Sequence, residues 1–317
     1  MIKKTLFVIF ILALFFAAFM VFKNRSKISN PLPSASLPEK ENLQNLPQVA
    51  VIAKNLRVPW SLVFLPDKRL LFTERAGEVK VLNSEGTIKT ILKIEDVKQV
   101  GEGGLLGTTI DPDYDSNKFI YFYYTYSENG NNNLNKVIRY SLENDTLSSV
   151  KIIVDNIPGS VNHNGGRIKF GPDKLLYIAT GDSSEPSLSQ DKNSLAGKIL
   201  RVKSDGGVPF DNPFGNLVYS YGHRNPQGIT WDGDGRLWET EHGPTAHDEV
   251  NLIKKGANYG WPDIRGDATK AGMEIPKIQS GRGTWAPSGV TYFENSLFFA
   301  GLRGTALFEA KINGESL

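Results

Sequence analysis

One short pattern recurs four times along the chain, at residues 65–82, 171–184, 231–244 and 293–310. Each copy begins with a turn that carries Asp or Asn, continues into a run of apolar residues, and ends in a turn that contains glycine. Such runs between turn-forming residues predict antiparallel strands. A sandwich of two sheets would not repeat this unit at a regular spacing. Successive copies are roughly 50 to 110 residues apart, which is the length of one or two four-stranded blades of a propeller. We therefore expect an all-β fold, a β-propeller.

The rest of the chain is consistent with that fold. Apolar residues come in short runs, often alternating with polar ones, and no window of helical length shows a 3.6-residue apolar stripe. This pattern disfavours an alternating α/β plan and predicts strands in thirteen segments. They are residues 49–53, 60–66, 69–74, 78–82, 119–126, 136–142, 167–172, 175–181, 198–202, 217–222, 236–241, 290–293 and 296–301.

The N-terminus has the composition of a membrane-directed segment. Lys3 and Lys4 precede an uncharged run from Thr5 to Phe22, and more basic residues follow at once. The run nearly reaches the length that spans a bilayer, which favours an uncleaved anchor over a cleaved signal peptide. Residues 1–27 are thus expected to be an anchor or signal, residues 28–48 a proline-rich linker, and residues 49–317 one extracytoplasmic propeller domain.

Charge and cysteine content exclude several classes of function. The 36 basic and 34 acidic residues leave a net charge of +2, so the basic surface of a nucleic-acid-binding protein is missing. There is no cysteine, which excludes disulfides, thiolate metal sites and cysteine nucleophiles. A small molecule or a protein is the expected partner.

A first candidate site surrounds His163. The histidine enters a predicted strand between Asn162 and Asn164, and the two glycines that follow allow a ligand to approach the backbone. An imidazole in that position suits a general base. The alternative is a histidine that only bonds a loop carbonyl.

The turns at residues 222–228 and 101–107 carry two further, separate candidates. Arg224 and Asn225 offer donors for a carboxylate or phosphate, unless the arginine only pairs with an acid of a neighbouring blade. Glu102 begins a glycine-rich turn that lacks the Lys and Ser/Thr of a phosphate loop. A plain turn between strands is the commoner meaning of such a run, and the functional alternative points the Glu102 carboxylate at the propeller axis.

Another candidate site spans residues 241–251. Asp248 and Glu249, together with the carbonyls of Gly243 and Pro244, supply hard oxygen ligands that suit Ca²⁺. Two histidines of the same segment would favour zinc if they converged, but their spacing is not that of a helical zinc motif. A solvated acidic turn is the remaining alternative.

Taken in order, eight motifs resemble those of the soluble quinone-dependent glucose/sorbosone dehydrogenases, also called aldose sugar dehydrogenases. The resemblance covers residues 58–308 and implies a six-bladed propeller that holds pyrroloquinoline quinone (PQQ) and Ca²⁺ at its axial mouth. The motifs are GEGGLLG (101–107), HNGGRIKFGPD (163–173), YIATGDSS (177–184), AGKILRV (196–202), GHRNPQG (222–228), EHGPTAHDEVNLI (241–253), NYGWP (258–262) and WAPSG (285–289).

The resemblance also implies roles for individual residues. His163 is similar to the base that takes the proton of the anomeric hydroxyl while hydride passes to the quinone. Arg224 and Asn225 resemble a cofactor-binding pair, and the carbonyls of Gly243 and Pro244 resemble those that hold the cofactor's Ca²⁺. Further positions match the cofactor site, namely Glu102, Asp182 and Arg303, or an additional structural Ca²⁺, namely Asp248, Glu249 and Tyr259.

The chain departs from the family in three places. Glu102 stands where some members have glutamine, and Asn162 where some have aspartate. The sequence ends at Leu317, earlier than is usual in the family, so we expect an incomplete last blade.

The sequence therefore predicts an oxidoreductase that converts aldoses to lactones with PQQ as hydride acceptor. Its partners would be a sugar substrate and an external electron acceptor, with membrane association through the N-terminus and no nucleic acid. Two alternatives are open: a calcium-dependent propeller lactonase or hydrolase, and a non-catalytic propeller that binds glycans or proteins.

Overall fold

Strands dominate the fold of this protein. The computed structural model describes residues 50–317 apart from 129 and 131, and in this part nineteen strands form five antiparallel sheets. Within each sheet every strand pairs with the next one along the chain. The all-β propeller expected from the repeat is therefore confirmed. The only helices among the described residues are α2 (Tyr114–Asn117) and a 3₁₀ turn at Pro186–Ser189.

The sheets follow one another in chain order. The first contains β1 (Pro59–Phe64), β2 (Leu70–Glu74), β3 (Glu78–Leu82) and β4 (Ile88–Lys93). The second contains β5 (Leu105–Ile110), β6 (Phe119–Glu128), β7 (Asn132–Glu143) and β8 (Thr146–Pro158). The third contains β9 (Ile168–Phe170), β10 (Leu176–Thr180), β11 (Lys198–Val202) and β12 (Val218–Tyr221). The fourth contains β13 (Pro226–Trp231), β14 (Leu237–Glu241), β15 (Glu249–Ile253) and β16 (Ile278–Gln279). The fifth contains β17 (Pro287–Phe293), β18 (Ser296–Gly301) and β19 (Ala306–Lys311).

The repeated aspartate of the sequence holds the turn between the first two strands of a sheet. Asp67, Asp173 and Asp232 each accept a backbone N–H two residues further on, at 3.0–3.1 Å. In the first and third sheets the residue after the aspartate, Lys68 or Lys174, has a left-handed φ of 69° or 60°. A short side chain that bonds the backbone stabilises such a turn, which is why the pattern recurs at this point.

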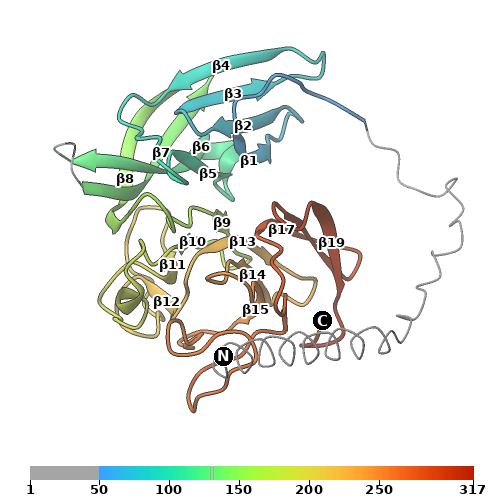
Figure 1. The fold of residues 1–317 in the computed structure, drawn as a ribbon. Helices are drawn as coiled ribbons and strands as arrows, with labels where there is room; N and C mark the ends of the chain where they lie inside the picture. The colour runs from blue at the N-terminus through green and yellow to red at the C-terminus, as the bar shows by residue number, and fades with distance from the viewer. Residues whose placement is uncertain (1–49, 129, 131) are drawn as a thin grey trace, which may run out of the picture. The chain divides into compact units, whose positions relative to one another are not determined.

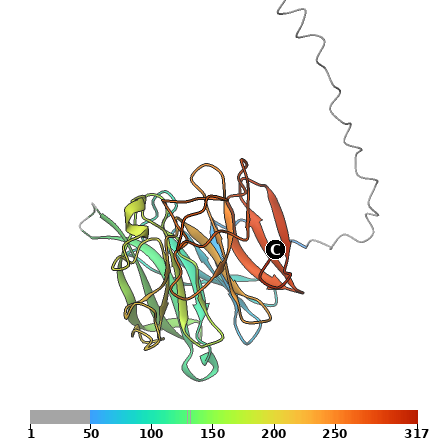
Figure 2. The same ribbon diagram turned by 90° about the horizontal axis from the view of Figure 1, so that it is seen from below.

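Four apolar clusters lie between consecutive sheets and hold them around a common axis. Figure 1 shows the sheets in order from cyan through green, yellow and orange to red, and Figure 2 shows the green and red sheets on opposite sides. The first strands, β1, β5, β9, β13 and β17, contact one another in sequence along the axis. Representative buried pairs are Leu71 and Leu105, Tyr121 and Ile168, Ile199 and Ile229, and Trp238 and Val290.

The expectation of six blades is wrong, because the described strands complete four sheets of four and one of three. The sixth blade was inferred from the family resemblance and not from a strand pattern. A groove of about 920 Å³ lies where the first and fifth sheets face each other, lined by β1, β17, β18 and the axial strands. Apolar side chains at this groove are exposed, including Leu62 at 62%, Phe293 at 60% and Leu307 at 71%.

Other expectations have different outcomes. Residues 50–53 form no strand, although their composition favours one, since strand β1 begins only at Pro59. The other twelve predicted segments each coincide with a strand. The N-terminal hydrophobic helix and the linker lie outside the described residues. In the described part, the helices are too short to cross a membrane. Residues Ile52–Leu317 form one compact unit.

Candidate functional site

The predicted site residues gather at one end of the propeller, the end where first strands begin and second strands finish. Glu102, His163 and Arg224 precede β5, β9 and β13, while Asp182 and Gly243 follow β10 and β14. Because neighbouring strands are antiparallel, these loops meet at the same end of the axis. Residues 61 positions apart, such as His163 and Arg224, thereby come into contact.

His163 is oriented by a buried carboxylate. Its Nδ1 lies 2.7 Å from Oδ1 of Asp182, whose side chain is fully buried, while the histidine side chain is 18% exposed. Trp261 donates its indole N–H to the other carboxylate oxygen at 2.8 Å, and Ser184 donates its backbone N–H to Oδ1 at 2.8 Å. His163 has a left-handed φ of 58°. Such a backbone conformation is uncommon in residues other than glycine, and residues that adopt it are concentrated at functional sites.

Arg224 fixes the tautomer of the imidazole. Its Nη2 lies 2.8 Å from Nε2 of His163. Since a guanidinium only donates, Nε2 must accept, and the ring proton lies on Nδ1, where it bonds Asp182. The same guanidinium donates through Nη1 to the carbonyls of His242 and Gly243, at 3.0 and 2.7 Å. Burial lowers the pKa of Arg224, and its buried Nε has no hydrogen-bond partner.

Glu102 and Asn225 complete the wall opposite Asp182. Glu102 Oε2 accepts the backbone N–H of His163 at 2.8 Å and the amide N–H of Asn225 at 3.3 Å. Asn225 accepts in turn from the backbone of Gly165 at 3.1 Å and from Gln227 at 3.0 Å. The glutamate therefore supports the His163 backbone, and it does so although some family members have a neutral amide in its place.

The carbonyls expected to hold Ca²⁺ border a small cavity. This space of about 10 Å³ is lined by Gly243, Pro244, Glu249, Tyr259 and neighbours that include Arg224. A cavity of that size matches about one water molecule or ion. In this structure the Arg224 guanidinium borders the cavity and donates a hydrogen bond to the Gly243 carbonyl. A hard cation at this point would meet oxygen ligands.

Asp248 acts here as a clamp for the loop before β17. Its Oδ1 accepts the N–H of Gly243 at 2.9 Å, and its Oδ2 accepts from Thr284, Trp285 and Ala286 at 2.6–2.8 Å. Both carboxylate oxygens are thus used by the protein. A role for Asp248 as a metal ligand stays a prediction; three donors fill Oδ2, and only Oδ1, which accepts one hydrogen bond, has a lone pair left for a cation.

Glu249 and Tyr259 also line the cavity. Burial, followed by the charge of Glu241, raises the pKa of Glu249 to about 8, so a cation beside it would be stabilising. The hydroxyl of Tyr259 donates to the carbonyl of Leu252 at 2.6 Å and accepts the N–H of Lys254 at 2.8 Å. Only the backbone carbonyl of Tyr259 is therefore available to a metal.

Arg303 lies in the turn between β18 and β19, which is at the same end of the fifth sheet. Its backbone N–H bonds the carbonyl of Trp285 at 3.1 Å. No described residue forms an ion pair with its guanidinium. The structure thus places Arg303 at the correct end of the propeller, and its contact with a cofactor stays a prediction.

Trp261 and Glu241 are site residues that sequence reasoning missed. Trp261 belongs to the NYGWP motif, but nothing in the motif indicates that its indole reaches a carboxylate 79 positions away. Glu241 accepts the backbone N–H of Arg224 at 3.0 Å and contacts Nδ1 of His223 at 3.1 Å. A glutamate at the end of an otherwise buried strand was the available signal, because carboxylates are rarely buried without a function or partner.

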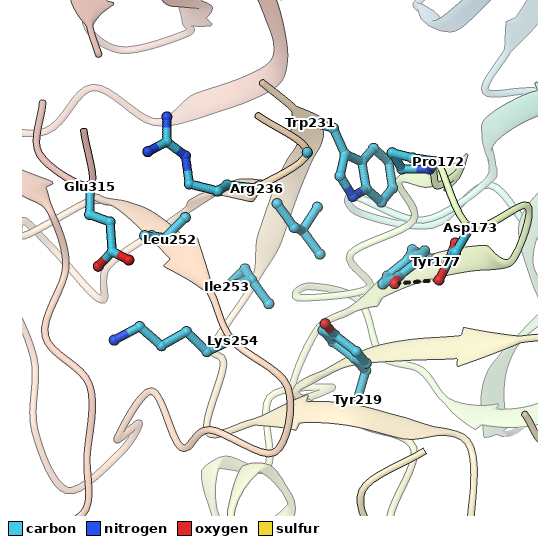
Figure 3. Close-up of a pocket in the computed structure, with 12 residues that line it drawn as sticks. Pro172, Asp173, Tyr177, Tyr219, Trp231, Arg236, Leu252, Ile253, Lys254 and Glu315 are labelled. Carbon is cyan, nitrogen blue, oxygen red and sulfur yellow. Dashed lines mark hydrogen bonds between the residues drawn. The ribbon is translucent and has the colours of Figure 1, made fainter. Parts of the chain in front are cut away.

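A second pocket opens at the opposite end of the propeller, between the third and fourth sheets. Figure 3 shows Tyr177, Tyr219 and Trp231 around it, with Tyr177 bonded to Asp173 at 3.0 Å. Its volume is about 280 Å³, larger than that of the cavity beside Gly243. Asp173 is already paired with Arg201 at 2.8 Å, so its carboxylate is not a free base.

The residues present fit a tri-acid quinone and its cation. Arg224 carries a buried donor without a partner, and its guanidinium faces a mouth lined by carbonyls and polar side chains. Gly165 and Gly181 allow the His163 loop to pack closely against the end of strand β10, since a Cβ on Gly181 would lie 2.0 Å from the His163 carbonyl. An anion at the guanidinium and a hard cation at the carbonyls are both chemically suited.

Comparison with known proteins gives one consistent family. The family model described as glucose/sorbosone dehydrogenase matches residues 56–316. Aldose sugar dehydrogenase YliI of Escherichia coli is 33% identical over 269 residues, covering 80% of this chain and 72% of the relative. Quinoprotein glucose dehydrogenase B of Acinetobacter calcoaceticus is 34% identical over 250 residues, covering 68% of this chain. The chain spans about half (52%) of the length of that relative.

Solved structures agree with the sequence comparison. The PQQ-bound form of an aldose sugar dehydrogenase from Streptomyces coelicolor superposes with a TM-score of 0.81 at 39% identity, covering 84% of this chain and 81% of that one. The family model spans the strands and loops that carry His163, Asp182 and Arg224. The chain belongs to the glucose/sorbosone dehydrogenase family.

Proposed function

We propose that this protein oxidises the anomeric carbon of aldose sugars to lactones, with PQQ as the hydride acceptor and Ca²⁺ as its companion ion. The observation that carries the proposal is the imidazole of His163, whose Nδ1 is bonded to a buried carboxylate and whose Nε2 accepts at the mouth of the propeller. Support comes from relatives that are named glucose and aldose sugar dehydrogenases and from the PQQ-bound neighbour.

His163 has the chemistry of a general base in this geometry. Asp182 accepts the Nδ1 proton at 2.7 Å, which leaves the Nε2 lone pair for the proton of a sugar hydroxyl and stabilises the imidazolium that results. Trp261 and Ser184 hold the carboxylate from two further directions. His163 is therefore already oriented to accept a proton, and the substrate needs only access to its Nε2.

Access to Nε2 depends on Arg224. The guanidinium now donates to Nε2 at 2.8 Å and to the Gly243 carbonyl at 2.7 Å, so it covers the base and the proposed Ca²⁺ ligand at once. An anionic cofactor would compete for these donors, since charge-assisted bonds to carboxylates are stronger than bonds to neutral acceptors. Turning Arg224 towards the cofactor would expose both the base and the carbonyl.

When bound, PQQ supplies the two-electron acceptor, and Ca²⁺ supplies a Lewis acid beside it. The chain's own residues would bind and orient the cofactor: Arg224 contacts His163, Asn225 is bonded to Glu102, and Gly243 and Pro244 border the cavity that Arg224 also lines. Glu249 and the Tyr259 carbonyl are proposed for a structural Ca²⁺, and Arg303 for the outer edge of the cofactor.

The location proposed for this activity is extracytoplasmic. The support is the N-terminal run Thr5–Phe22 between basic residues, which is typical of an exported or anchored chain. The physiological electron acceptor would then be an external one.

The test is reconstitution. The purified chain should reduce an artificial electron acceptor in the presence of an aldose only when both PQQ and Ca²⁺ have been added, and the product should be the lactone. Opening of a lactone without quinone would instead indicate a hydrolase. Absence of turnover together with absence of quinone binding would indicate a binding protein.

A further inference from the structure

A polar group lies in the interior between the third and fourth sheets, behind the wall that carries Arg224. Strands β14 and β15 pair in a register that puts Glu239 opposite Asn251 and Glu241 opposite Glu249. Alternation along both strands points these four side chains to the same face of the sheet, and donor atoms of Glu239 and Glu241 lie near His223. None of the four is more than 8% exposed.

This arrangement is costly unless something neutralises it. Like charges directly opposite each other on a sheet are destabilising, and a buried carboxylate without a cation is more so. Within the described residues, no lysine or arginine forms an ion pair with Glu239, Glu241 or Glu249.

Two oxygen atoms in the group have no hydrogen-bond partner although they are buried. They are Oε1 of Glu239 and Oδ1 of Asn251. The other atoms of the same side chains are satisfied, because the Asn251 amide donates to Oε2 of Glu239 at 3.1 Å. Most buried polar atoms in proteins are paired, so orphaned oxygens on facing residues point to a missing electrophile.

His223 completes a ligand set. Its Nδ1 lies 3.1 Å from Oε2 of Glu241, and donor atoms of His223, Glu239 and Glu241 all fall within 4.8 Å of one another. Zinc bonds of about 2.0–2.2 Å put the ligand atoms of a tetrahedral site about 3.4 Å apart, so the three side chains would move closer together around the ion. The Ser220 hydroxyl contacts Nε2 of the His223 imidazole at 2.9 Å. Metal-binding histidines commonly have such a partner on the second nitrogen.

We propose that His223, Glu239 and Glu241 bind a divalent transition-metal ion of the zinc type in the interior between the third and fourth sheets. Asn251 Oδ1 is available as a fourth ligand, and one neutral imidazole with two carboxylates would make the site electrically neutral. An imidazole among the ligands disfavours Ca²⁺ and favours zinc. Glu241 also lines the cavity beside Gly243, but the proposed ligand set contains neither the Gly243 nor the Pro244 carbonyl and needs no quinone.

The role that follows is structural. The ion would tie β14 to the loop before β13, because Glu241 also accepts the backbone N–H of Arg224. Since the group is closed to solvent, the ion would enter during folding.

In the experiment, the purified chain is refolded without PQQ in the presence of Zn²⁺ or Co²⁺. Gel filtration in a buffer that contains a chelator then removes metal that is not held by the protein. Wild type is expected to retain one zinc per chain by elemental analysis, and the cobalt form to show the visible bands of a site with nitrogen and oxygen ligands. Glu239→Gln, which keeps the shape of the side chain and removes a buried charge, should lose the metal. Glu74→Gln, at a fully buried glutamate that already pairs with Lys80, is the matched control and should retain it.

Three results would overturn the proposal: no zinc or cobalt retained by wild type, equal retention by Glu239→Gln, or equal loss by Glu74→Gln. The cobalt spectrum of wild type decides the matter even if a variant does not fold. Dehydrogenase activity has no part in this readout, so failure of one proposal leaves the other testable.

Discussion

The buried contact between Trp261 and Asp182 allows a quantitative test of how the base is held. Asp182 accepts His163 and Ser184 on one oxygen and Trp261 on the other. In Asp182→Asn only one oxygen remains. If it faces His163 and Ser184, the new amide donates towards the Trp261 indole, which is also a donor. If it faces Trp261, the amide meets the Ser184 N–H instead, and His163 must change tautomer and point an N–H at Arg224.

The first orientation is the less costly one, so the main penalty of Asp182→Asn is a pair of opposed donors at Trp261. Leaving a buried donor unsatisfied costs about 1–3 kcal/mol. Replacing the indole as well, in Trp261→Phe, removes that conflict. We therefore expect Asp182→Asn to cost about 1–3 kcal/mol less in the Trp261→Phe background than in wild type.

The assay is the free energy of unfolding in denaturant for wild type, both single variants and the double variant, all without cofactor. Trp231→Phe serves as the control background, because its ring packs on Tyr177 at the other end of the propeller. With that control the two effects should add. Additivity within about 0.5 kcal/mol in the Trp261→Phe cycle would refute the reasoning, because it would show that the indole and the carboxylate do not interact.

Three further predictions concern the same end of the propeller. Lys198→Met should destabilise the protein by about 2–4 kcal/mol, since its ammonium donates to three backbone carbonyls at 2.6–3.0 Å. Burial lowers the pKa of this lysine to about 7, so between pH 7 and its ordinary value of 10.5 the unfolded chain binds more protons than the folded one. The stability of wild type relative to Lys198→Met should therefore rise with pH over this range. A stability difference that does not change with pH, measured by denaturant titration, would contradict this. Gly181→Ala should cost about 1–3 kcal/mol by calorimetry, because its Cβ would meet the His163 carbonyl, and an unchanged melting temperature would count against the described loop. Arg224→Lys should weaken binding of PQQ at least about tenfold in a fluorescence titration, since an ammonium lacks the planar pair of donors that a guanidinium presents to a carboxylate, and equal affinity would exclude the proposed anion contact.

Much of the fold was predictable because its signals are local. The aspartate turns at Asp67, Asp173 and Asp232 recur in the sequence for a reason that the structure makes plain: each accepts the backbone of its own hairpin. The strands β8 and β13 were not predicted, because exposed polar residues interrupt the first and glycine and proline the second. The number of sheets was wrong because it came from the family and not from the strands.

The candidate site was predictable at the level of residues and not of contacts. His163, Arg224 and Glu102 stand out by type and by the glycines beside them, and the structure brings them within hydrogen-bond distance. The indole of Trp261 and the polar interior around Glu239 depend on pairings between distant segments. No local pattern in one sequence reports such pairings, since they follow from how neighbouring sheets pack.

The most direct test of the proposed function is the turnover number of wild type and His163→Gln at saturating PQQ, Ca²⁺ and aldose, with quinone affinity measured on both proteins. Because a general base contributes at least about a hundredfold to such a reaction, the variant should lose at least that factor while its quinone affinity stays within a few-fold. A turnover number that survives the substitution, in a protein that still binds the quinone, would contradict the assignment of His163 as the base.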